Sequence, residues 1–195
     1  FNRYNYFIKR IIDFVSIILL LPILIITILY IYAMKKIQNI DESIFYKQKR
    51  YGIGNSIFHM YKLRTMYIDS DLKGNTSQDD PRIYFFAKAI RNMRLDEIPQ
   101  IINILQNDMH LVGPRAEWVK LSDEYNLKIN YYSKRHTVRP GITGWAQIAY
   151  PYGFDIYDAE QKLMYDLYYI KNWSVWLELE ICFKTFLVIL DKKGI

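Results

Sequence analysis

Residues 14–34 read FVSIILLLPILIITILYIYAM and contain no charged side chain. At about 1.5 Å of helical rise per residue, this stretch can cross a bilayer core of roughly 30 Å. Its length, and the lack of a small-residue cleavage site after it, argue against a cleaved signal peptide. Two forms of membrane helix remain: a spanning helix kinked at Pro22, or a helix that enters the membrane, bends between Ser16 and Pro22 and returns.

Basic residues flank the apolar stretch on both sides: Arg3, Lys9 and Arg10 before it, and Lys35 and Lys36 after it. Cytoplasmic segments next to membrane helices carry such an excess of positive charge, and a single crossing would place one of the two groups on the wrong side. The sequence therefore favours a re-entrant hairpin of two half-helices within residues 1–38, with both ends on the cytoplasmic side.

The composition of the 195-residue chain restricts its function further. The length fits one domain with a sizeable core. Twenty-six Lys and Arg against 20 Asp and Glu give a net charge of +6, which favours anionic partners such as phosphates, nucleic acid or an acidic membrane surface. Cys182 is the only cysteine, so an intrachain disulfide is excluded and a reducing compartment fits best.

Residues 39–195 are predicted to form one cytosolic α/β domain that is mainly helical with a small β element. Residues 45–66 show the β-branched and aromatic alternation of short strands around a Gly52-x-Gly54 turn. Residues 69–82 have the composition of a loop. Helices are expected at about 83–93, 98–106, 117–130, 156–171 and 173–190.

The last of these helices, at 173–190, has polar residues on one face and large apolar residues on another. Glu178 and Lys184 fall on one face, and large apolar residues gather near another: Trp173, Trp176, Leu179, Phe183, Phe186, Leu187 and Leu190. Such a pattern is typical of a helix that lies in the membrane interface, and a buried core helix is the alternative.

A second informative stretch, RLDEIPQIINILQNDMHLVGPR at residues 94–115, places two carboxylates side by side. Asp96 has N-cap chemistry, and Pro99 fits the first turn of a buried helix that starts there. Acids in a first turn complement the helix dipole, which would by itself explain Asp96 and Glu97.

Arginines around this pair suggest a second explanation. Arg91, Arg94 and Arg115 bracket the two acids in sequence. Carboxylates, a divalent cation and arginines gathered around a phosphate form a phosphoryl-transfer site, and one carboxylate is then free to act as a nucleophile.

Three motifs occur in order behind the basic-flanked apolar run: YKLRTM (61–66), the 94–115 stretch and RPGITGWAQ (139–147). Together they resemble the bacterial sugar transferases called monotopic phosphoglycosyl transferases, over nearly the whole chain. The resemblance implies transfer of a sugar 1-phosphate from a UDP-sugar to a polyprenyl (undecaprenyl) phosphate, at the cytoplasmic face of the bacterial inner membrane. It also implies a role in starting the synthesis of a surface polysaccharide or glycoconjugate.

The same resemblance assigns roles to individual residues. Asp96 would be the nucleophile that takes the phosphosugar covalently, Glu97 its partner in acid/base work, and Mg²⁺ would bind at Asp96 and the diphosphate. Substrate contacts are implied for Lys62, Arg64, Thr65, Arg91, Arg94, Pro114, Arg115, Arg139 and Trp145. For Trp145, packing in the core is an equal alternative to stacking on the nucleotide. The chain departs from the family pattern at Asn107, His110 and Ala116, where glycine, serine and proline are common.

Two other functions compete with this one. A non-catalytic, membrane-anchored basic module would explain the charge and the anchor but would leave the carboxylate pair idle. A nucleic-acid binder is disfavoured because the basic residues are scattered and the anchor is unexplained. The expected partners are therefore the two substrates and membrane lipid, without nucleic acid, and the choice between a monomer and a homodimer stays open.

Overall fold

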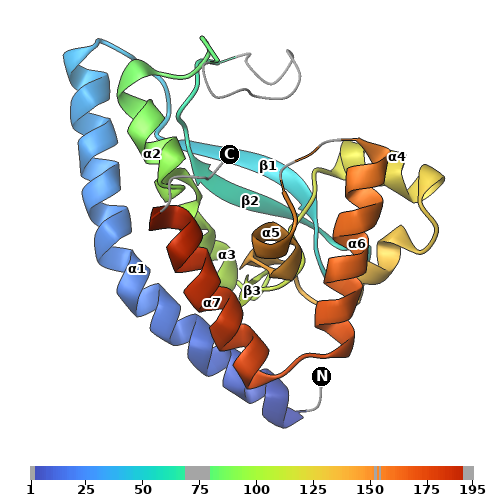
Figure 1. The fold of residues 1–195 in the computed structure, drawn as a ribbon. Coiled ribbons are helices and arrows are strands. Elements are labelled where there is room, and N and C mark those ends of the chain that lie inside the picture. Colours follow the sequence, from blue (N-terminus) through green and yellow to red (C-terminus); the bar gives the residue numbers. More distant parts are fainter. Residues whose placement is uncertain (1–2, 69–79, 152, 154, 191–195) are drawn as a thin grey trace.

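The computed structural model describes residues 3–68, 80–151, 153 and 155–190, and Figure 1 shows its fold. Its elements, in chain order, are α1 (Arg3–Ile37), β1 (Phe45–Tyr51), η1 (Ile53–Asn55), β2 (Ile57–Leu63), η3 (Phe85–Ala87), α2 (Lys88–Asn92), η4 (Leu95–Gln100), α3 (Ile101–Leu105), β3 (His110–Val112), α4 (Val119–Lys128), η5 (Tyr132–Thr137), β4 (Gly141–Thr143), α5 (Trp145–Ala149), α6 (Ile156–Lys171) and α7 (Val175–Leu190). The expected mainly helical fold with a small β element is confirmed.

The apolar N-terminal segment forms one helix, α1, of 35 residues with Pro22 inside it. Among the described residues it is the one helix long and apolar enough to cross a membrane. The prediction of two separate half-helices is wrong, because α1 is continuous and bends near its middle (Figure 1). A proline removes a single hydrogen bond of the helix ladder, so the turns on either side persist. The Ser16 hydroxyl donates to the Asp13 carbonyl (2.7 Å), so it does not replace the bond lost at Pro22.

One stripe of α1 is buried against the rest of the chain, and the remainder of its surface is largely apolar and exposed. The buried side chains are mostly three, four or seven residues apart: Lys9, Asp13, Ser16, Ile17, Leu24, Thr27, Ile31 and Lys35. This spacing is that of one helix face.

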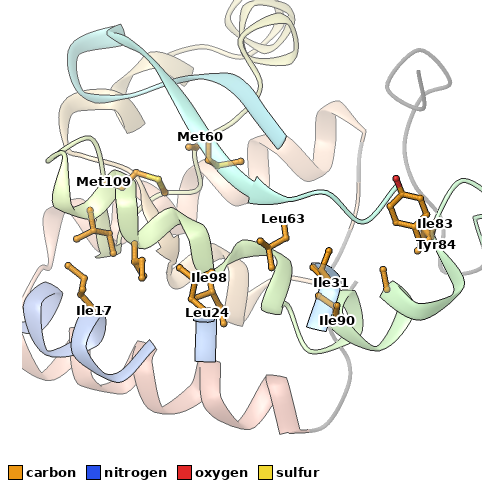
Figure 2. Packing of buried hydrophobic residues seen from close by; sticks show 14 of the residues in the cluster. Ile17, Leu24, Ile31, Met60, Leu63, Ile83, Tyr84, Ile90, Ile98 and Met109 are labelled. Carbon is orange, nitrogen blue, oxygen red and sulfur yellow. The ribbon is translucent and has the colours of Figure 1, made fainter. Parts of the chain in front are cut away.

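The antiparallel hairpin of β1 and β2 forms where strands were expected, with Phe45 opposite Leu63 and Tyr51 opposite Ile57. Gly54 in the connection has φ 60°, a left-handed conformation that glycine adopts without strain. Figure 2 shows η4 and α3 lying between this hairpin and α1, with Met60 and Leu63 on one side and Ile17 and Leu24 on the other. The segment that carries the carboxylate pair is therefore held between the hairpin and the apolar helix.

The expected helix boundaries hold in part. Residues 156–171 form α6, whose bounds match the prediction, but residues 98–106 are divided between η4 and α3. Asp96 is not an N-cap, because the chain enters η4 through Arg94, whose φ of 54° is left-handed, and Asp96 lies inside the tight 3-10 turn. Most of the expected 69–82 loop, residues 69–79, lies outside the described residues.

A second, parallel sheet was not expected. It pairs β3 with β4, with His110 opposite Gly141 and Val112 opposite Thr143. The backbones approach so closely that a Cβ atom added to Gly141 would lie 2.1 Å from the Gly113 amide nitrogen. Glycine is therefore required there, and it allows the second and third sequence motifs to pack against each other.

The C-terminal helix α7 packs one side on the core and exposes apolar side chains on another, and its place in the membrane interface stays a prediction. Leu177 and Ile181 are buried in a cluster with Tyr169, whereas other apolar residues are exposed: Trp176, Leu179, Phe183, Phe186 and Leu187. Glu178, expected on the same polar face as Lys184, is 1% exposed and pairs with Lys9 of α1 at 2.7 Å.

Candidate active site

Asp96 and Glu97 lie on η4, where three segments meet. Lys62 of β2 donates to Glu97 Oε1 at 2.7 Å, and Arg115, which follows β3, approaches the same oxygen at 3.5 Å. Both carboxylates are buried, with 8% and 7% of their surfaces exposed. The sequence predicted this grouping of two acids with a lysine and an arginine from separate motifs.

The two carboxylates differ in their electrostatic environment. Burial, reinforced by the negative charge of Glu97, raises the pKa of Asp96 to about 6 against the attraction of Lys62. Burial would also raise the pKa of Glu97, but Lys62, Arg115 and Arg94 together outweigh it and hold that pKa well below its usual range. Near neutral pH, Asp96 is therefore largely ionised and close to its titration range, while Glu97 is a carboxylate fixed by a cation.

Other predicted residues surround this pair at a greater distance. The Arg91 guanidinium donates to the buried Thr65 hydroxyl at 3.2 Å, and its charge acts on Asp96. Arg64 lies over the ring of Tyr46, 5.6 Å from its centroid. Pro114 is buried directly before Arg115, where it fixes the turn that aims the guanidinium.

Arg139 and Trp145 make contacts elsewhere. Arg139 Nε donates to the Asn107 carbonyl at 2.7 Å, and its guanidinium lies 5.5 Å from the centroid of Tyr6. Trp145 stacks on Tyr168 with 6.1 Å between ring centroids and packs against the α7 cluster. These are packing contacts, and no bond in the described part of the chain joins either residue to Asp96 or Glu97. Their roles in substrate binding stay predictions.

Sequence reasoning missed a set of charged groups behind Arg115. The buried Arg135 pairs with Asp166 at 2.7 Å and donates to the Arg115 carbonyl at 3.1 Å. Arg50 donates to the carbonyl of the residue after Arg115 at 3.0 Å. Burial would raise the pKa of Glu117, but Arg135, Arg115 and Arg50 outweigh it and lower that pKa. These groups come from β1, η5, α6 and the segment after β3, which are far apart in the chain, so no local pattern revealed them.

The carboxylate pair fits a magnesium site that the substrate would complete. No group of three or more His, Cys, Asp or Glu that could hold a metal occurs in the described part of the chain. Mg²⁺ is often bound through one or two carboxylates together with substrate phosphates and water. Asp96, buried beside Glu97, would supply such a carboxylate once the substrate brings its phosphates to the site.

Comparison with known proteins agrees with the motifs. A profile of the family described as bacterial sugar transferase matches residues 4–192. The chain is 40% identical over 190 residues to the UDP-N-acetylgalactosamine-undecaprenyl-phosphate N-acetylgalactosaminephosphotransferase of Aeromonas hydrophila, covering 96% of this chain and 45% of that protein. It is 39% identical over 159 residues to the UDP-glucose:undecaprenyl-phosphate glucose-1-phosphate transferase of Xanthomonas campestris pv. campestris, covering 77% of this chain and 32% of that protein.

A third relative is closer in length. The chain is 38% identical over 187 residues to the protein named uncharacterized sugar transferase EpsL of Bacillus subtilis, covering 96% of this chain and 89% of that protein. The chain thus spans less than half the length of the first two relatives and most of the third.

Proposed function

The chain belongs to the bacterial sugar transferase family, and on that premise we propose that it transfers a sugar 1-phosphate from a UDP-sugar to undecaprenyl phosphate through a covalent aspartyl intermediate. One observation carries the proposal: a buried aspartate, largely ionised near neutral pH, lies beside a glutamate held by Lys62 and Arg115. The relatives from Aeromonas hydrophila and Xanthomonas campestris, whose names specify UDP-sugars and undecaprenyl phosphate, support the choice of substrates.

The reaction divides into two displacements at the same phosphorus atom. In the first, an Asp96 oxygen attacks the phosphorus bonded to the sugar 1-oxygen, the bond from that phosphorus to the bridging oxygen breaks, and UMP leaves with the bonding electrons. In the second, an oxygen of undecaprenyl phosphate attacks the same phosphorus and Asp96 leaves as a carboxylate. The aspartate is thereby regenerated, and the diphosphate bond broken in the donor is replaced by one in the product.

The remaining groups of the site stabilise charge. Both steps bring an anion towards an anionic phosphate, so Lys62 and Arg115 would lower the barrier by opposing this repulsion. We assign Glu97 the acid/base role; because Lys62 and Arg115 hold its pKa well below its usual range in the free protein, this role requires that substrate phosphates draw those cations away from it. Mg²⁺ held by Asp96, with the neighbouring Glu97, would neutralise negative charge on the diphosphate.

The test is intact mass measurement of the protein mixed with a panel of UDP-sugars and no acceptor. The wild type should gain the mass of one phosphosugar on a peptide containing Asp96 and release one equivalent of UMP. Asp96→Asn should fold, gain no mass and release no UMP. Near-wild-type transfer by Asp96→Asn would refute the assigned nucleophile and would favour the non-catalytic or another catalytic role for the pair.

We further infer that α1 is re-entrant, with both ends at the cytoplasmic face of the inner membrane. Near one end, Lys9 Nζ donates to the Val112 carbonyl at 2.9 Å; near the other, Lys35 Nζ donates to the hydroxyl of the core residue Tyr84 at 3.5 Å and lies 4.9 Å from the centroid of its ring. A bilayer cannot pass between two ends that pack on one continuous core, whose cluster extends from Ile17 to residues of β2 and η4.

Cysteine labelling tests this topology. In a Cys182→Ser background, single cysteines at Asn5 and at Gln38 should both resist a membrane-impermeant thiol reagent in intact spheroplasts and react once the membrane is opened. Labelling of Asn5→Cys from outside would show a spanning helix.

A further inference from the structure

Side chains of α1 bind three consecutive residues of strand β3. Asp13 Oδ1 accepts the Leu111 amide N–H at 2.8 Å, Asp13 Oδ2 lies 2.7 Å from His110 Nδ1, and Lys9 Nζ donates to the Val112 carbonyl at 2.9 Å. Lys9 and Asp13 are each 2% exposed and lie one helical turn apart, so they face β3 together. The strand is therefore held along the polar part of the buried face of α1.

These bonds are more than an anchor requires. An apolar helix can pack on a domain through apolar contacts alone, as α1 does at Leu24 and Ile31. Burying a lysine and an aspartate costs free energy unless both are hydrogen-bonded. Here both are: Lys9 also pairs with Glu178 at 2.7 Å, and Asp13 also contacts Arg10 at 3.3 Å. The polar contacts fix the position of the β3 backbone, which apolar packing does less specifically.

The chain between β3 and the candidate site has little freedom to move. The Gly113 amide donates to the Thr143 carbonyl at 2.8 Å, and the Gly141 amide donates to the Pro114 carbonyl at 2.9 Å. A Cβ on Gly113 would lie 2.7 Å from the Arg139 carbonyl oxygen, so the backbones are already in close contact. Arg115 follows directly, and its guanidinium reaches Glu97. A shift of β3 along α1 would therefore be passed to Arg115.

We propose that Asp13 and Lys9 are positioning residues of the site: by fixing β3 they set the place of Arg115 against Glu97 and the donor diphosphate, so that the membrane helix is part of the catalytic geometry. The inference rests on the proposed function. It also gives His110, one of the departures from the family pattern, a partner in Asp13. A purely structural role for the two residues is the alternative, and the two roles differ in whether the loss depends on Arg115.

A double-mutant cycle separates these roles. Asp13→Ala removes the acceptor of the Leu111 amide, and Asp13→Asn keeps one acceptor oxygen with the same shape. If Asp13 acts by placing Arg115, Asp13→Ala should lower kcat/KM for the UDP-sugar by about 10- to 100-fold, the size expected for a misplacement on the order of 1 Å. Asp13→Asn should recover much of this loss. In an Arg115→Ala background, Asp13→Ala should then cause little further loss, because the residue it positions is gone.

The matched control is Thr27→Val. Thr27 is also a buried polar residue of α1, but its hydroxyl bonds only within the helix, to the Ile23 carbonyl at 2.7 Å. It should leave kcat/KM unchanged. Equal fold losses from Asp13→Ala with and without Arg115 would overturn the positioning role, as would no loss from Asp13→Ala at all.

Two further measurements keep the inference testable. If Asp13→Ala fails to fold, Lys9→Met can be combined with Glu178→Leu. This double change removes the Lys9 bond to β3 and leaves neither member of the Lys9–Glu178 pair as an unpaired buried charge, and the same cycle with Arg115 applies. Hydrogen exchange of a peptide covering residues 110–115 needs no turnover: Asp13→Ala should speed it and Thr27→Val should not. If Asp13→Ala leaves the exchange of residues 110–115 unchanged, the positioning role is refuted even when the enzyme is active. If the wild type proves inactive but Asp13→Ala still speeds exchange, only the proposed reaction is refuted.

Discussion

Replacement of Lys62 by methionine should move the pH dependence of the reaction to higher pH. Lys62 is the cation nearest to the pair, 2.7 Å from Glu97, and its charge lowers the pKa of both carboxylates. The nucleophile must be ionised, so the wild-type rate should fall as the pH drops through the pKa of Asp96, about 6. Without Lys62, two adjacent buried carboxylates would hold a proton to higher pH, because both lose their closest opposite charge.

The size of this change follows from the usual effect of a neighbouring charge. The charge of Lys62 is the strongest of the effects that lower the pKa of Asp96, and loss of an opposite charge within about 4–6 Å raises a carboxyl pKa by about one to three units. A rise of about two units would reduce the ionised fraction of Asp96 at neutral pH from about nine-tenths to about one-tenth, a nearly tenfold loss of rate. At alkaline pH the variant should regain this part of its activity, and any deficit that remains would measure direct contact of Lys62 with substrate.

The assay is the rate of UMP release at saturating Mg²⁺, UDP-sugar and undecaprenyl phosphate over roughly pH 5.5 to 9.5, with detergent-solubilised protein. Lys49→Met is the matched control, because Lys49 is an exposed lysine on the neighbouring strand β1, and its acid limb should coincide with that of the wild type. A lower plateau for Lys62→Met with an unmoved acid limb would refute the electrostatic role of Lys62, and an acid limb moved to lower pH would refute the sign of the argument.

Three further outcomes are expected. Glu97→Gln should lower the rate of UMP release by about 10²- to 10⁴-fold, since it can no longer accept a proton, and a smaller loss would limit Glu97 to holding charge. Phe183→Ser combined with Phe186→Ser should weaken liposome flotation of the purified chain, because each exposed ring would contribute about 1.5–3 kcal/mol when it becomes buried in lipid. Leu127→Ser on α4 is the control and should not weaken flotation. Equal flotation of the double variant and the wild type would argue against an interfacial α7. Asp166→Ala should lower the free energy of unfolding by about 3–5 kcal/mol, seen as a lower Tm, because it leaves its buried arginine partner uncompensated, and an unchanged Tm would contradict this.

Periodicity and turn residues predicted the elements whose formation depends mainly on nearby residues. The apolar periodicity of residues 156–171 gave α6 its bounds, and the strand alternation with glycines gave the β1–β2 hairpin. The parallel pair β3–β4 could not be predicted in this way, because each strand has three residues and its stability comes from a partner far along the chain. The left-handed Arg94 was missed for a related reason: a non-glycine residue there is held by its surroundings and not by its own preference.

The candidate site shows the same division. Motif matching identified the residues that touch each other at its centre, Asp96 and Glu97 with Lys62 and Arg115. It did not identify the groups that hold Arg115 in place, because these lie on α1, η5 and α6 and have no common sequence pattern. A buried lysine and a surface lysine look alike in sequence, so the sequence identifies Lys9 only as one of the basic residues that flank the membrane helix.

The burial of Lys9 and Lys35 changes the reason for placing both ends of α1 on one side of the membrane. The positive-inside tendency treats Lys9 and Lys35 as free charges that prefer the cytoplasmic side, but both are buried, at 2% and 4% exposure, and bonded to the rest of the chain. Among the flanking basic residues whose burial is described, charge preference can therefore act through the more exposed Arg10 and Lys36. The stronger constraint is geometric: a lysine near each end of α1 is bonded to residues outside the helix, and moving either end across a bilayer would break those bonds and expose a core. An α1 with both ends on one side needs neither change, and its bend at mid-length lets the exposed apolar face enter the membrane while the polar groups at its ends stay bonded.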